Sequence, residues 1–199
     1  MKIPVFLACA ALGWGQIARP QLGLMLNAEG AVRPVYGTAA SATLGDAVLT
    51  GVRSFGCSAR ICLFKTGTAI IAPDGSSADA PAGAAIFTME GASAYIYFPG
   101  TQQWARWQDG QLEWMDFAPG EAVSTGTVMP LEDGSIVAAA DHIAVVRRDG
   151  TELDFAVAGV RQFFAMGKGY VQAVTDTGMW ILRVEPGREQ IFLLPGISP

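Results

Sequence analysis

Short apolar runs alternate with polar turns along most of the chain. The clearest examples are rich in β-branched and aromatic residues and are separated by Gly-Lys-Gly, Asp-Thr-Gly and Pro-Gly-Arg: Phe163–Met166, Tyr170–Val174, Met179–Val184 and Gln190–Leu194. Such runs, bounded by turn residues, are typical of β-strands. No window shows a sustained apolar stripe at the helical period. The sequence therefore predicts an all-β protein with almost no helix.

The strand pattern recurs at a fixed interval. Four segments end alike, at Gly83, Gly120, Gly159 and Gly196, and these closing glycines are 37, 39 and 37 residues apart. A turn glycine precedes each of them, and three of the four turns are Asp-Gly, a strong hairpin signal. The repeat divides the chain into units at about 46–83, 84–120, 121–159 and 160–196, with a partial unit at about 22–45. Four short strands per unit of this length are typical of a β-propeller blade.

Two stretches carry a resemblance to a known superfamily. The segments Leu131–Ala139 (LEDGSIVAA) and Val145–Gly150 (VVRRDG) resemble blade sequences of bacterial NHL-, PQQ- and WD40-like propellers. The resemblance covers Leu22 to Gly196, but the Gly-His and Trp-Asp dipeptides of true WD40 repeats are absent, so it selects no subfamily. It implies an all-β, propeller-like domain of about four and a half to five blades of four antiparallel strands. A β-sandwich or barrel is the alternative, because regularly spaced short strands also suit those folds.

The N-terminus predicts export. Lys2 is followed by an apolar run, Ile3–Leu12, and small residues Gly13 and Gly15 precede a cut before Gln16. We therefore expect a signal peptide at 1–15 and one domain at 16–199, periplasmic or secreted. A lipid-anchored form ending its signal at Cys9 and an uncleaved segment are the alternatives. The uncharged stretch is too short to span a bilayer comfortably, and no later stretch predicts a membrane span in the mature chain.

The two cysteines that follow the signal peptide favour the same compartment. Cys57 and Cys62 flank the four residues Ser58 to Ile61, which look like a turn between two strands. Cysteines that face each other across such a turn can form a disulfide. A redox-active pair or half of a zinc site is the alternative, without a second cysteine pair or a neighbouring histidine to support it. We expect no metal site and no cofactor.

Charge and histidine content exclude several functions. Of the residues, 51% are apolar and 16% are charged, and the net charge is −5. The basic residues form no cluster beyond Arg147-Arg148, so we expect no nucleic-acid partner. His142 is the one histidine, without a serine elbow or a second base beside it. The chain has enough carboxylates for a two-carboxylate glycosidase, which remains an alternative. The sequence nevertheless favours a protein that is not an enzyme, and it predicts no catalytic residue.

Two groups of residues are candidate binding sites. Arg53 and Arg161 begin two similar segments, Val-Arg-Ser-Phe and Val-Arg-Gln-Phe, and a propeller would place them at equivalent positions facing a central channel. Two converging guanidiniums would bind a carboxylate or phosphate, whereas each would tie blades together if paired with an acidic residue. Trp104 and Trp107 lie three residues apart and face opposite sides of a strand, so at least one leaves the core. An aromatic residue outside the core could stack on a sugar ring or anchor a protein partner. The alternative is that it packs between two blades.

The sequence as a whole predicts an exported, non-catalytic binding or scaffolding module with a disulfide. A protein partner in the cell envelope or outside the cell is the first expectation. A carbohydrate-binding or glycan-active protein that uses the aromatic residues of the second complete unit is one alternative. An anion-binding site at Arg53 and Arg161 is the other.

Overall fold

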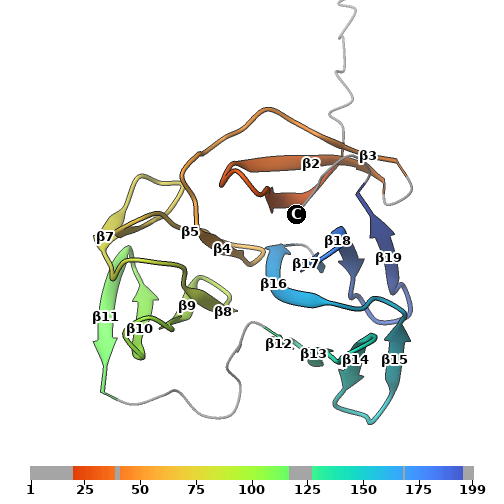
Figure 1. Ribbon diagram of the computed structural model, residues 1–199. Coiled ribbons are helices and arrows are strands. Elements are labelled where there is room, and N and C mark those ends of the chain that lie inside the picture. The colour runs from red at the N-terminus through yellow and green to blue at the C-terminus, as the bar shows by residue number, and fades with distance from the viewer. Residues whose placement is uncertain (1–19, 39–40, 117–126, 168, 195–199) are drawn as a thin grey trace, which may run out of the picture.

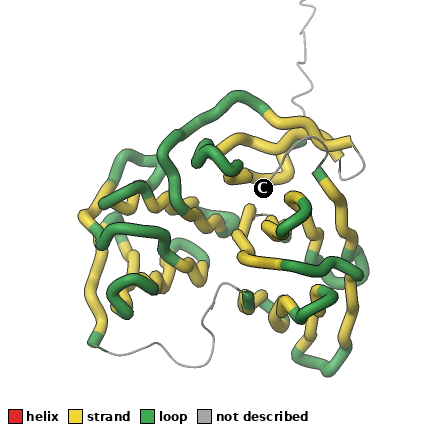
Figure 2. The backbone as a smooth tube through the Cα atoms, in the orientation of Figure 1, coloured by secondary structure: helices red, strands yellow, loops and turns green. Residues whose placement is uncertain are grey.

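The computed structural model describes residues 20–38, 41–116, 127–167 and 169–194. Within these ranges the chain contains β-strands, turns and loops and no helix (Figure 2). The all-β prediction is therefore confirmed, and no helix long enough to cross a membrane occurs in this part of the chain.

The strands form antiparallel groups in sequence order (Figure 1). The first group contains three strands: β1 (Gln21–Leu26), β2 (Val32–Thr38) and β3 (Ser41–Leu44). The second contains β4 (Ser54–Cys57), β5 (Cys62–Lys65), β6 (Ala69–Ile71) and β7 (Ser77–Asp79). The third contains β8 (Ile86–Glu90), β9 (Ser93–Phe98), β10 (Gln103–Gln108) and β11 (Gln111–Met115).

Two further groups complete the molecule. The fourth contains β12 (Val128–Leu131), β13 (Gly134–Ala138), β14 (Ile143–Arg147) and β15 (Glu152–Phe155). The fifth contains β16 (Val160–Gly167), β17 (Tyr170–Thr175), β18 (Gly178–Arg183) and β19 (Gln190–Leu193). A single parallel bridge between Met166 and Cys57 joins the second and fifth groups into one eight-stranded sheet.

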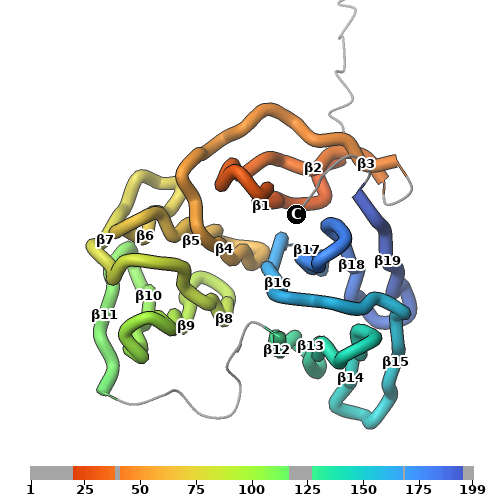
Figure 3. The backbone as a smooth tube through the Cα atoms, in the orientation of Figure 1, coloured from red at the N-terminus to blue at the C-terminus, as the bar shows by residue number. Residues whose placement is uncertain are grey.

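The five groups are arranged around a common centre, with β1, β4, β8 and β16 close to it (Figure 3). Three apolar clusters hold neighbouring groups together. One lies between the first, second and fifth groups, another between the second and third, and the last between the fourth and fifth. No cluster formed by the described residues joins the third group to the fourth, so this junction differs from the others.

Strand direction distinguishes the first group from the others. The Ser54 hydroxyl accepts a hydrogen bond from the Ala85 amide at 2.8 Å, and a Cβ on Gly56 would lie 2.7 Å from the Cβ of Phe87, so β4 and β8 run side by side in one direction. Strand β16 runs parallel to β4. In contrast, Gly23 near the start of β1 approaches the end of β16, while Gly30, after β1, accepts from the Val52 amide just before β4. Strand β1 therefore runs opposite to β4 and β16.

Candidate functional site

From Trp104 to Gln108, strand β10 alternates between half-buried and buried residues. Ala105 and Trp107 are fully buried, whereas Trp104 and Arg106 are half-buried. The buried face packs against Leu63 and other apolar residues of the second group. The prediction that the two tryptophans face opposite sides is confirmed, and Trp107 belongs to the core.

The opposite face of the same sheet is rich in aromatic side chains. Tyr97 is directly opposite Trp104 in the strand register, and their rings stack with centroids 4.5 Å apart and planes 26° from parallel. Tyr95 is opposite Arg106, whose guanidinium carbon lies 5.6 Å from the tyrosine ring centroid. We call Tyr95, Tyr97, Trp104 and Arg106 the aromatic face. Its side chains point away from the second group, because they alternate with those that pack on it.

Arg106 lacks the partners that a partly buried guanidinium normally has. Its Nε atom is buried and has no hydrogen-bond partner among the described residues. Glu113 is opposite Arg106 in the register, but the two form no ion pair in the described part of the chain. The cation–π contact with Tyr95 holds the guanidinium against the sheet and satisfies none of its N–H groups.

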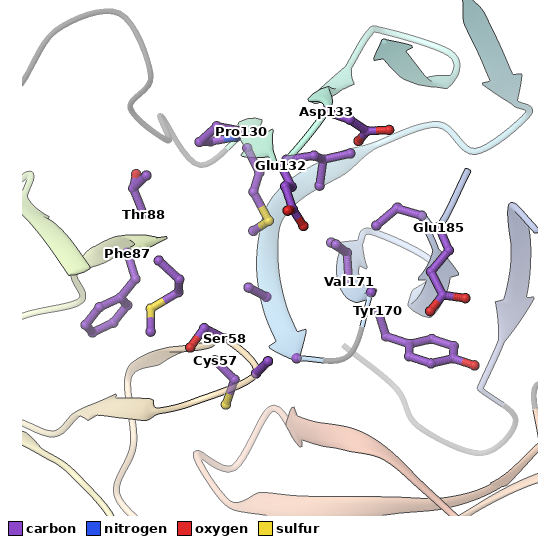
Figure 4. A pocket seen from close by; sticks show the side chains of 18 of the residues that line it. Cys57, Ser58, Phe87, Thr88, Pro130, Glu132, Asp133, Tyr170, Val171 and Glu185 are labelled. Carbon is purple, nitrogen blue, oxygen red and sulfur yellow. The ribbon is translucent and has the colours of Figure 1, made fainter. Parts of the chain in front are cut away.

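A pocket of about 530 Å³ adjoins this sheet near the centre of the molecule. Its lining comes from the turn between β4 and β5, from β8, from β12 and the turn after it, and from β16, β17 and the segment after β18. We call it the central pocket (Figure 4). The side chains of Phe87 and Thr88 in β8 point in opposite directions, as expected for successive strand residues.

The central pocket and the aromatic face are continuous. Thr88 lines the pocket and is directly opposite Tyr95, which is in turn opposite Arg106. Residues directly opposite each other in a sheet share a face. A single row therefore leads from the pocket across the sheet to the guanidinium.

Three carboxylates line the central pocket, and two are already paired. Asp133 accepts a hydrogen bond from Arg147 at 2.5 Å, and Glu185 pairs with Arg183. Glu132 forms no ion pair with any residue that the structure describes. Its carboxylate is directed towards the middle of the pocket, whereas that of Asp133 points away (Figure 4).

The predicted disulfide is confirmed and forms part of the pocket wall. Cys57 and Cys62 are bonded at the ends of β4 and β5, with Cα atoms 4.1 Å apart. The Ser58 amide donates to the Ile61 carbonyl at 2.8 Å and closes the four-residue turn. The bond therefore links the two strands of the hairpin, and Cys57 lines the central pocket.

The two arginines that the sequence predicts as an anion site have different surroundings. Arg161 is exposed and forms an ion pair with Asp176, in the turn after β17 of its own group. Arg53 is exposed and lines a second pocket of about 340 Å³ with Asn27 and Glu29. The anion site stays a prediction, and the ion pair of Arg161 lies within the fifth group, so it does not join two groups.

His142 lies on the surface among carboxylates. Its Nδ1 is 2.8 Å from Asp141 Oδ1, and its Nε2 is 3.6 Å from Asp154 Oδ1. The hydrogen bond with Asp141, and then the charge of Asp154, raise the pKa of His142. Within the described ranges, no group of three or more His, Cys, Asp or Glu side chains is arranged to hold a metal ion.

Arg106, Thr88 and Glu132 are not among the binding residues that the sequence predicts. The alternation of Tyr95 and Tyr97 with apolar residues in β9 was the available signal for this face. Pairing of β9 with β8 and β10 was needed to place Thr88 and Arg106 in the same row.

No family model and no curated protein matches this chain. Among solved structures, the chain is similar to PorZ, described as an essential bacterial surface component of the type-IX secretion system of Porphyromonas gingivalis. The sequence identity is 11% and the TM-score is 0.31. The match covers 88% of this chain and 26% of the PorZ chain. A similarity this low assigns neither a family nor a function.

Proposed function

We propose that this chain is an exported, non-catalytic binding module of propeller type. Its ligand is a segment of a protein partner, which lies in a groove formed by the aromatic face and the central pocket. The observation that carries the proposal is the difference between the two faces of the third sheet. One face is packed in the core, while the other combines stacked aromatics, a guanidinium that pairs with no carboxylate of the described residues, and an adjoining pocket.

The propeller assignment is supported by the strand groups and their directions. Four groups have four strands each in simple antiparallel order, and β4, β8 and β16 run parallel near the centre. Because β1 runs the other way, the first group corresponds to the last three strands of a blade whose first strand is not among the described residues. The chain is thus a five-bladed arrangement with one incomplete blade.

Export is supported by the disulfide and by the N-terminal sequence. Disulfides persist in oxidising compartments and are rare in the cytosol. The segment 1–15, which predicts a signal peptide, lies outside the described residues.

Aromatic residues beside an arginine favour protein binding. Trp, Tyr and Arg are the residue types most enriched among those that dominate binding energy at protein interfaces. The half-buried state of Trp104 and Arg106 leaves apolar and polar area to be covered by a partner. A concave pocket at one end of the face gives a partner side chain a place to insert.

The test compares Trp104→Ala with Trp114→Ala in the full chain. Trp114 lies on the same sheet but on its other face and is 52% exposed, so it is a matched control. Each protein is immobilised, and captured envelope proteins are quantified together with the thermal midpoint of the bait. We expect a partner that binds the wild type and Trp114→Ala but not Trp104→Ala or Tyr97→Ala. If Trp104→Ala and Tyr97→Ala capture the same proteins as the wild type, the proposal is wrong.

A glycan is the second candidate, favoured by the stacked pair of Tyr97 and Trp104. Stacked aromatics present a flat apolar surface of the kind on which a sugar ring packs. Titration of neutral oligosaccharides against tryptophan fluorescence distinguishes the two candidates. A saturable change that Trp104→Ala removes supports the glycan, and a flat response across the panel excludes it.

A further inference from the structure

We infer that the segment bound in the groove is an extended peptide of mixed charge, with a carboxylate for Arg106 and a basic side chain for Glu132. This inference rests on the proposed function and specifies the chemistry of the ligand. The groove is defined by Thr88 and Glu132 in the central pocket and by Tyr95, Tyr97, Trp104 and Arg106 on the aromatic face.

The positive end of the groove is Arg106. Its buried Nε has no acceptor among the described residues, and no ion pair joins it to their carboxylates. Because Nε itself is buried, a ligand would bind the terminal N–H groups of this half-buried guanidinium. A carboxylate is the acceptor that suits a guanidinium best, because it can accept two parallel N–H bonds.

The negative end of the groove is Glu132. The nearby guanidinium of Arg147 is occupied by Asp133, by Glu189 at 2.8 Å and by the Val184 carbonyl at 2.6 Å. Arg147 is therefore not available to Glu132, although Glu132 neighbours Asp133 in the chain. No cation among the described residues pairs with this carboxylate, and a carboxylate directed into a pocket favours a ligand with an ammonium or guanidinium group.

The two ends discriminate between classes of ligand. A neutral glycan satisfies neither charge, and a purely acidic or purely basic peptide satisfies one while it faces repulsion at the other. Thr88, Tyr95 and Arg106 form a row on one face of the sheet, which an extended segment can follow. A mixed-charge peptide is thus the ligand whose charges match those of the groove.

The probe is an array of twelve-residue peptides with randomised apolar and aromatic positions. Four matched sets carry Asp and Lys, Asp and Ser, Lys and Ser, or Ser alone at the same polar positions. Binding of the labelled full chain is compared for the wild type, Arg106→Gln and Glu132→Gln. The controls are Arg161→Gln and Glu29→Gln, which make the same charge changes outside the groove.

We expect the wild type to bind the Asp-plus-Lys set most strongly. Arg106→Gln should lose the preference for Asp and keep that for Lys, and Glu132→Gln should do the reverse. Each loss should be about tenfold, the order of a charge-assisted hydrogen bond. Both controls should keep the wild-type profile.

The failures of the two proposals are distinguishable. If all four sets bind equally, or if the groove variants keep the wild-type profile while Trp104→Ala abolishes binding, the charge inference is wrong and the peptide-binding proposal stands. If the wild type binds no set above background, both are wrong. Circular dichroism of each variant confirms that the fold is intact.

Discussion

The side-chain amide of Gln172 pairs with the backbone of Leu26, 146 residues away in the sequence. Its Nε2 donates to the Leu26 carbonyl at 2.8 Å, and its Oε1 accepts from the Leu26 amide at 3.0 Å. Both bonds are buried, and they lie at the edge of β1 that faces away from β2. The amide thereby supplies, for one residue, the donor and acceptor that a neighbouring strand would provide.

We expect Gln172→Leu to destabilise the protein by about 2–4 kcal/mol, because it leaves a buried amide and a buried carbonyl without partners. The free energy of unfolding in urea measures the loss. Gln190→Leu, at an exposed position of β19, is the control and should cost little. Equal midpoints for the two variants would show that the Gln172 bonds do not hold the first group in place.

Arg147 forms a similar tie between the fourth and fifth groups. Its side chain is 8% exposed and bonds Asp133, Glu189 and the Val184 carbonyl. Arg147→Met should lower the free energy of unfolding by about 3 kcal/mol, because it leaves the hydrogen-bond and ion-pair partners of a buried cation unpaired. Arg148→Met, which removes the exposed neighbouring charge, should be near neutral. The two variants are compared by chemical unfolding at neutral pH.

The same cluster predicts a dependence of stability on acid pH. Hydrogen bonding from its own backbone, and then from Arg147, lowers the pKa of Glu189 below its ordinary value of 4.5. A lowered carboxyl pKa contributes stability above the unfolded-state value, and this contribution disappears as the pH falls through the folded-state pKa. We expect the wild type to lose stability below about pH 4.5 more steeply than Glu189→Gln. If the stabilities of the wild type and Glu189→Gln fall equally steeply with decreasing pH, this prediction is wrong.

His142 is predicted to titrate above its ordinary pKa. Because it is the one histidine of the chain, its ring resonances can be followed by NMR without ambiguity. Asp141→Asn should lower the pKa of His142, because the Asp141 hydrogen bond is the largest cause of the rise, and Asp154→Asn should lower it less. Protonated His142 contributes stability below its unfolded-state pKa, and this contribution disappears as the pH rises through the higher folded-state value.

Truncation of the two tryptophans of β10 should lower the free energy of unfolding by different amounts. Trp107→Ala opens a cavity in a fully buried site and should cost about 3–5 kcal/mol. Trp104→Ala removes a half-buried ring that stacks on Tyr97, so it should cost about 0.5–1.5 kcal/mol. Urea unfolding of both variants tests the difference, and a larger loss at Trp104 would place that residue in the core.

The sequence by itself determined the strands, the hairpin disulfide and the opposite directions of Trp104 and Trp107. These features depend on residues a few positions apart: a period of two, turn glycines, and cysteines on either side of a four-residue turn. The predicted strand Tyr170–Val174 accordingly differs from β17 by one residue at its end, and Met179–Val184 differs from β18 by one residue at each end.

Only the tertiary structure decided which polar groups meet. Arg161 pairs with Asp176, whereas Arg106 pairs with no carboxylate of the described residues, although both arginines lie in strands. Contacts such as Gln172 with Leu26, and the row from Thr88 to Arg106, depend on which strands become neighbours and in what register. A one-residue shift such as that between Val160 and Gln162 changes every later position along a strand, and no local pattern fixes it.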